Sequence, residues 1–146
     1  MKEPLAYLAC PFSHPDRRIR FKRYRQCCEV TAALMRLGVL VFSPLAHSVM
    51  VHEKYRLPDE WEFWRRIDFA FLDRCTELLV LTLPGWEESV GVQAELARAR
   101  ARGMRITFIA GCSAAEAHWP WEPGVEGSNP STQTKAVRRN HDFKGN

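Results

Sequence analysis

A short apolar strand that runs into a helix is the feature that most limits how this chain can fold. Leu78–Leu83 is the most apolar run of the sequence, and Pro84-Gly85 marks a turn directly after it. Val92, Leu96 and Ala99 then recur at the spacing of a buried helical stripe. This pattern predicts a strand-to-helix crossover, the place where open α/β sheets bind small molecules.

The remaining segments repeat this alternation. Strands are predicted at residues 5–10, 39–42, 78–83 and 105–109, and helices at 17–37, 60–74 and 89–103. Residues 43–58 form a long connection that we expect to contain a short helical turn and to cover a site, and Asp59 is the expected N-cap of the helix after it. The order predicts an α/β fold: a flavodoxin- or Rossmann-like three-layer sandwich with a parallel sheet of four or five strands.

The domain organisation follows from length and composition. With 146 residues the chain fits one domain, assigned to residues 1–110, followed by a partly irregular C-terminal extension over 111–146. The net charge of +4 suits a small anionic substrate or solvated helix faces equally well, and no motif for binding a nucleic-acid polymer is present.

Cysteine and histidine usage narrows the expected chemistry further. The five cysteines include no C-x-x-C pair, and no signal peptide or long apolar span is evident, so we expect a cytoplasmic chain with reduced thiols and no membrane segment. The histidines lack the spacing of metal ligands, and neither a metal nor an organic cofactor is expected. They are His14, His47, His52, His118 and His141.

Two carboxylates lie on helix faces that otherwise look buried. Glu95 lies on the buried stripe of its helix. It is either a partly exposed glutamate paired with Arg98 or Arg102, or a nucleophile for glycosyl transfer. Asp68 has the same two interpretations: a solvated partner of Arg65, or an acid whose pKa partial burial has raised.

The residues that follow the strand ends are the other site candidates. The carboxyl ends of parallel strands meet at one edge, so Ser13, His47 and Ser89 should lie close to Glu95. Ser89 is the expected N-cap of its helix, and with the backbone N–H groups near Gly91 it is also a candidate for binding phosphate. Candidates to complete this anion site are Ser13, Arg17 and Arg18.

Several of these segments resemble the nucleoside 2-deoxyribosyltransferase superfamily and its 2′-deoxynucleoside 5′-phosphate N-hydrolase relatives. The likeness lies in Tyr7-Leu8-Ala9, in Asp68, and in Ser89-Val90-Gly91-Val92-Gln93-Ala94-Glu95-Leu96. The chain is also similar to an uncharacterised bacterial family of that superfamily, at Pro11-Phe12-Ser13-His14-Pro15, Phe42-Ser43-Pro44, Trp61-Glu62-Phe63-Trp64 and Leu83-Pro84-Gly85-Trp86.

The resemblance implies roles for the individual residues. Glu95 matches the nucleophile, Asp68 the acid near the base, and Tyr7 a tyrosine that positions the nucleophile. Ser89 stands where the transferases carry an aspartate and where the N-hydrolases carry a serine that binds the 5′-phosphate. Residues 1–110 would then be a nucleoside deoxyribosyltransferase-like domain acting on a small nucleoside or nucleotide, in a homo-oligomer.

The expected activity is cleavage of the N-glycosidic bond of a (deoxy)nucleoside 5′-monophosphate or nucleoside through the Glu95 nucleophile. Base exchange by deoxyribosyl transfer is one alternative. A nucleotide-binding or sensor module without turnover is the other.

Overall fold

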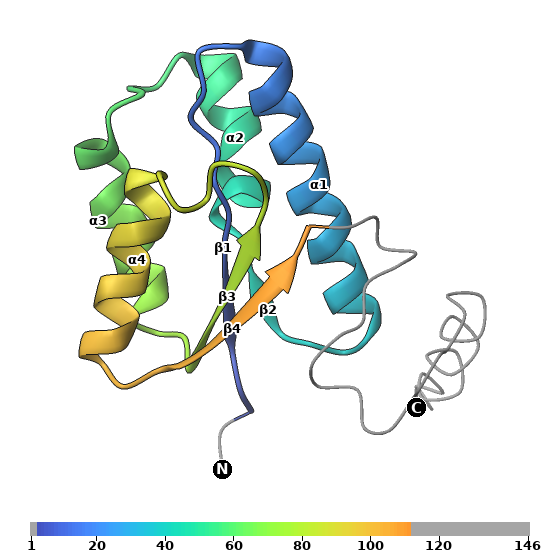
Figure 1. Cartoon of the computed structure of the whole chain (residues 1–146), viewed down its shortest axis with the longest axis vertical. Helices are drawn as coiled ribbons and strands as arrows, with labels where there is room; N and C mark the ends of the chain where they lie inside the picture. The colour runs from blue at the N-terminus through green and yellow to red at the C-terminus, as the bar shows by residue number, and fades with distance from the viewer. Residues whose placement is uncertain (1–2, 112–146) are drawn as a thin grey trace, which may run out of the picture.

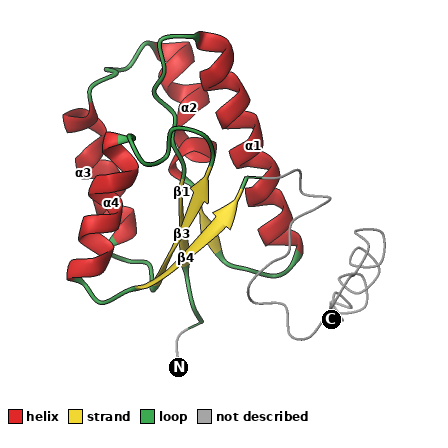
Figure 2. Ribbon diagram, in the orientation of Figure 1, coloured by secondary structure: helices red, strands yellow, loops and turns green. Residues whose placement is uncertain are grey.

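The computed structural model describes residues 3–111, which form eight elements in the predicted alternation (Figures 1 and 2). The strands are β1 (Ala6–Ala9), β2 (Val41–Phe42), β3 (Glu77–Thr82) and β4 (Arg105–Ala110). The helices are α1 (Arg17–Arg36), α2 (Pro44–Tyr55), α3 (Trp61–Leu72) and α4 (Val90–Ala101). The predicted C-terminal extension lies outside the described residues, apart from Gly111.

The four described strands form one parallel sheet in the order β2-β1-β3-β4. Helices α1 and α2 cover one face of the sheet, and α3 and α4 cover the other, which gives three layers (Figure 1). The predicted α/β three-layer fold is therefore confirmed, with four strands. From β1 the chain first moves to β2 on one side and later to β3 on the other, so the strand order reverses beside β1.

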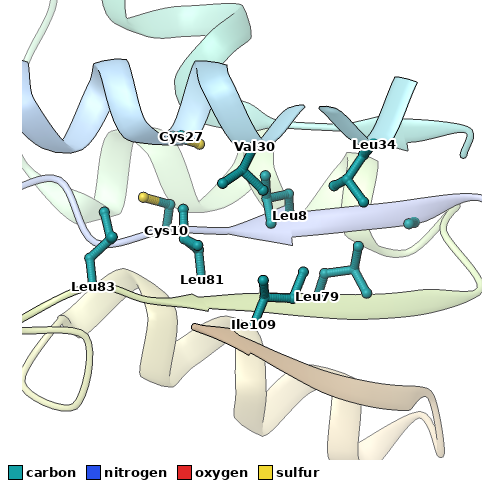
Figure 3. Packing of buried hydrophobic residues seen from close by; sticks show 10 residues of the cluster. Leu8, Cys10, Cys27, Val30, Leu34, Leu79, Leu81, Leu83 and Ile109 are labelled. Carbon is teal, nitrogen blue, oxygen red and sulfur yellow. The ribbon is translucent and has the colours of Figure 1, made fainter. Parts of the chain in front are cut away.

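The sheet is buried on both faces, because side chains alternate between them along each strand. Leu8 of β1 and Leu79 of β3 pack against Val30 and Leu34 of α1, as Figure 3 shows. The residues on either side of them in the strands belong to a second cluster beneath α3 and α4, and Tyr7 is one of them. This alternation directs the Tyr7 side chain toward α4.

The helix boundaries mostly follow the predicted signals. In α1 the Asp16 side chain accepts the Arg18 N–H at 2.8 Å, and Gly38 ends the segment with φ of +81°. The strand predicted at 39–42 is shorter, because the Val39 N–H donates to the Leu34 carbonyl and so completes the end of α1. None of the helices within residues 3–111 is long and apolar enough to cross a membrane.

The connection after β2 differs from the prediction. A complete helix of 12 residues, α2, replaces the expected short turn. Ser43 caps it by accepting the Ala46 N–H at 3.2 Å, and Pro44 occupies the first turn, where a missing N–H costs nothing. Asp59 does not cap α3: Glu60 holds the N-cap position without a side-chain bond, while Asp59 bonds His52 of α2.

Candidate active site

A cavity of about 850 Å³ opens at the carboxyl edge of the sheet, over the ends of β1 and β3. This is where the strand order reverses, the position at which such sheets bind ligands. Its lining includes Cys10, Ser13, Ser89 and Glu95, so the predicted meeting of the strand ends is confirmed for these residues. Helices α2 and α3 supply further parts of the lining.

Glu95 lies inside the protein and forms part of this lining. The residue is 4% exposed, and the Tyr7 hydroxyl donates to Glu95 Oε1 at 2.6 Å. The alternative pairing with Arg98 is wrong: Arg98 donates instead to both oxygens of Asp73, at 2.7 and 2.6 Å. Glu95 forms no ion pair within the described residues.

The surroundings of Glu95 favour its protonated form. Burial raises the pKa of Glu95 to about 8; the Tyr7 hydrogen bond opposes this increase, and the nearby Asp68 carboxylate adds to it. Burial and the charge of Glu95 also raise the pKa of Tyr7 well above its ordinary range. Tyr7 therefore stays a hydrogen-bond donor at neutral pH and stabilises the ionised carboxylate whenever it forms.

Asp68 reaches the same cavity from α3. The residue is 8% exposed and lines the cavity, and no hydrogen-bond donor meets its carboxyl within residues 3–111. Its expected surface partner, Arg65, pairs with Glu62 at 3.1 Å. Burial raises the pKa of Asp68 to about 7, so the carboxyl both holds and releases a proton near neutral pH.

The N-terminus of α4 forms another part of the cavity lining. Ser89 is the predicted N-cap, and its hydroxyl oxygen accepts the Val92 N–H at 3.3 Å. The N–H groups of Val90 and Gly91 meet no acceptor in the described part of the chain, as is usual in a first helical turn. Ser89 and Gly91 line the cavity, so these donors lie where an anion binds favourably.

The arginines at the cavity are not the ones proposed from the sequence. Arg17 is 68% exposed and pairs with Glu53, and Arg18 pairs with Asp16, so neither lines the cavity. Arg20 and Arg23 line it instead. The sequence contained a signal for them, because positions 20, 23 and 27 share one helical face and Cys27 is a buried core residue.

His47 lies outside the cavity. Its side chain packs against the rings of Phe42 and Phe71, at centroid distances of 5.6 and 5.8 Å, and its Nδ1 contacts the Ser48 hydroxyl at 2.9 Å. The helical winding of α2 is the reason, because it turns His47 away from the cavity and directs Ser48 and Val49 toward it.

An aromatic wall beside Asp68 had no role in the sequence interpretation. Trp61 and Trp64 were named only in a segment that resembles a bacterial family, yet both line the cavity. The Trp64 indole N–H donates to the Pro58 carbonyl at 2.8 Å, and its ring meets the His52 ring edge-on at 5.6 Å. The cavity thus has a flat apolar wall next to one acid and an N–H-rich wall at α4.

Metal binding finds no support in the described residues. Between residues 3 and 111, no three His, Cys, Asp or Glu side chains are grouped to hold an ion. His118 and His141 lie outside this range. The expectation that the chain uses neither a metal nor an organic cofactor stays a prediction.

Comparison with known proteins gives a family without an assigned activity. The model of a family described as a domain of unknown function (DUF1937) matches residues 5–111. No curated protein matches the chain. The matched range spans all eight elements of the fold and every cavity residue discussed above.

Proposed function

We propose that the chain, which belongs to the DUF1937 family, cleaves the N-glycosidic bond of a nucleotide or nucleoside. One observation supports this most strongly: Glu95 is buried, held by Tyr7 at 2.6 Å, and lines one cavity together with Asp68. Two carboxyl groups without a cationic partner suit a reaction that needs one as a nucleophile and one as an acid.

The proposed first step forms a covalent intermediate. Tyr7 occupies Glu95 Oε1, which leaves Oε2 to attack C1′ of the sugar. As the new C1′–O bond forms, the C1′–N bond breaks and its electron pair leaves with the base. Asp68 donates its proton to the departing nitrogen.

The second step releases the sugar. Water attacks C1′ of the glutamyl ester, the C1′–O bond to Glu95 breaks, and the ionised Asp68 takes the proton of the water. Both carboxyl groups return to their starting states, so one water is consumed for each base released. Tyr7 positions Glu95 throughout and does not touch the reacting bond.

The substrate end opposite the base is assigned to the α4 side of the cavity. The Ser89 hydroxyl and the free N–H groups of Val90 and Gly91 suit a phosphate, and Ser13 lies on the neighbouring loop. The likeness of Ser89 to the serine of the 5′-phosphate N-hydrolases supports a nucleotide. The superfamily likeness also favours a homo-oligomer that acts on a small molecule.

A nucleotide-binding module without turnover is the second candidate. It is favoured by the raised pKa values of Glu95 and Asp68, because a protonated carboxyl is a poor nucleophile. Base exchange by deoxyribosyl transfer differs from hydrolysis only in the acceptor of the sugar, and it requires an added base.

A base-release assay tests the proposal. Deoxynucleosides and their 5′-phosphates are incubated with wild type, with Glu95→Gln, and with Glu87→Gln as a control from the exposed segment before α4. Loss of the nucleophile should reduce release at least ~1,000-fold, while the control stays within ~2-fold. Equal release by wild type and Glu95→Gln would refute a glutamate nucleophile, and release only with an added acceptor base would identify a transferase.

A further inference from the structure

Two arginines of α1 face the cavity without a carboxylate partner. Arg20 and Arg23 line it, and neither forms an ion pair with any described residue. Their neighbours Arg17 and Arg18 do form ion pairs, but on the outer surface. Arg17 and Arg18 are thus neutralised at the surface, whereas Arg20 and Arg23 face the cavity without a carboxylate within the described residues.

Backbone carbonyls hold both guanidinium groups in place. Arg20 Nη1 donates to the carbonyls of His14 and Pro15, at 2.5 and 3.4 Å. Arg23 Nη1 donates to the Ser13 carbonyl at 2.8 Å and more weakly to Phe12 at 3.4 Å. A guanidinium has five N–H groups, so Nε and Nη2 of Arg20 and Nε of Arg23 remain to donate to a ligand.

Arg23 also fixes the distance between the two loops that hold the cavity. Its Nη2 donates at 2.8 Å to the carbonyl of Pro84, in the loop between β3 and α4. The next residue, Gly85, has φ of +93°, and a Cβ there would lie 2.4 Å from Arg23 Nη2. The guanidinium therefore packs against the loop that leads to Ser89, on the proposed phosphate side of the cavity.

The charges around these arginines leave room for an anion. Glu88 lines the same cavity with an exposed side chain and without an ion pair in the described residues. Asp59, at the α2–α3 side, is held by His52 Nε2 at 2.8 Å. Asp68 and Glu95 have pKa values near or above neutrality, so their charge is reduced. Arg20 and Arg23 therefore share the cavity with only one ionised carboxylate that has no partner in the described residues, that of Glu88.

Taking the cavity as the nucleotide site proposed above, we infer that Arg20 and Arg23 bind a second phosphate, so the preferred substrates are nucleoside 5′-diphosphates. The first phosphate is accommodated by Ser89 and the free N–H groups of α4, which leaves Nε and Nη2 of Arg20 and Nε of Arg23 for the next one. Arginine binds phosphate through paired N–H groups. The cavity of about 850 Å³ lies in the upper part of the usual range of about 300–1,000 Å³ for ligand sites.

Kinetics with a matched pair of variants tests this specificity. Arg20→Gln removes one cavity arginine, and Arg17→Gln removes an exposed arginine from the same helix. We expect wild type to prefer a deoxynucleoside 5′-diphosphate over the monophosphate by at least ~10-fold in kcat/KM. Arg20→Gln should lower kcat/KM for the diphosphate ~10- to 100-fold and kcat/KM for the monophosphate less than ~3-fold. Arg17→Gln should leave the preference for the diphosphate unchanged.

Binding measurements on Glu95→Gln separate this inference from the proposed reaction. Calorimetry compares the mono- and diphosphates and inorganic pyrophosphate, with and without Arg20→Gln. Tighter diphosphate binding that Arg20→Gln abolishes supports the second phosphate site even if no base is ever released. Base release without any diphosphate preference, or a preference that survives Arg20→Gln, overturns the inference while the proposed reaction stands. Arg23→Lys is the second variant, since it keeps the charge near both loops, and it should retain part of the preference.

Discussion

Carboxylates lie at both ends of the sheet, but only those at the amino end are paired with arginines. At the amino end, Glu77 of β3 is paired with Arg105 of β4, and Asp73 accepts two hydrogen bonds from Arg98. At the carboxyl end, neither Glu95 nor Asp68 has a cation beside it in the described residues. Each cationic partner at the amino end is an arginine from a neighbouring element.

This contrast separates carboxylates that stay ionised from carboxylates that titrate near neutral pH. Arg98 holds the pKa of Asp73 below its ordinary range, so Asp73 stays ionised at any physiological pH. Burial raises the pKa of Asp68 to about 7 and the pKa of Glu95 to about 8. A group that titrates near neutral pH can exchange protons during a reaction, whereas Asp73 remains the charged partner of Arg98.

Second only to the loss expected for Glu95→Gln, the largest effect is expected from Asp68→Asn, which removes the acid but keeps the size of the side chain. We expect base release to fall ~100-fold or more. Wild-type kcat/KM should peak between pH 7 and 8, because one carboxyl must be ionised and the other protonated. For the variant, kcat/KM should no longer decline at alkaline pH, but it should still rise as Glu95 ionises. A pH–rate profile for both proteins decides this, and an unchanged alkaline limb would exclude Asp68 as the acid.

A smaller effect concerns stability. The pKa of Glu95 is higher in the folded chain than its ordinary value, so the folded state holds the proton that the unfolded state releases. The free energy of unfolding should therefore decrease as pH rises from about 5 to 8, and Asp68 adds to the decrease. Glu95→Gln should remove part of this loss, on the order of 3 kcal/mol at pH 8, with little change at pH 5.

Urea denaturation at the two pH values measures the difference. The prediction is contradicted if Glu95→Gln is equally destabilised at both pH values. Such a result would mean that Glu95 acts as an ordinary hydrogen-bonded core residue.

The smallest effect is expected at the amino end. Glu77→Gln weakens the pair with Arg105, but that arginine is 69% exposed and water replaces the lost partner. We expect a loss of about 1 kcal/mol in the free energy of unfolding and base release within ~2-fold of wild type. Thermal denaturation and the base-release assay on the same preparation check both numbers. A large loss of activity would show that the two ends are not independent.

Much of the fold was predictable, because its signals are local. The stripe of α4, its cap at Ser89 and the apolar run of β3 indicated both elements and their order. Helix α2 was underestimated because Ser43-Pro44, a helix start signal, was interpreted as part of a loop. Asp59 looks like an N-cap by residue type, but His52, seven residues before it along the chain, provides a competing partner.

The site was predictable only in part, since side-chain direction depends on tertiary packing. Glu95 stood out because its stripe was otherwise apolar, and its residue type limited it to few roles. Arg17 was chosen over Arg20 because both lie in one basic run, and only the packing of α1 on the sheet distinguishes their directions. The bond between Tyr7 and Glu95 spans 88 positions, a distance at which local patterns carry no geometric information.

The position of β1 also affects how the chain is made. This strand is buried over its whole length, yet its principal partner, β3, begins 71 residues later in the register of the sheet. During synthesis on the ribosome, the first strand must remain unpaired on that side until residues 77–82 have emerged. The hydrogen bond between Tyr7 and Glu95 forms later still, because Glu95 lies beyond β3. The protein therefore acquires its proposed chemistry only after nearly the whole described region has been translated.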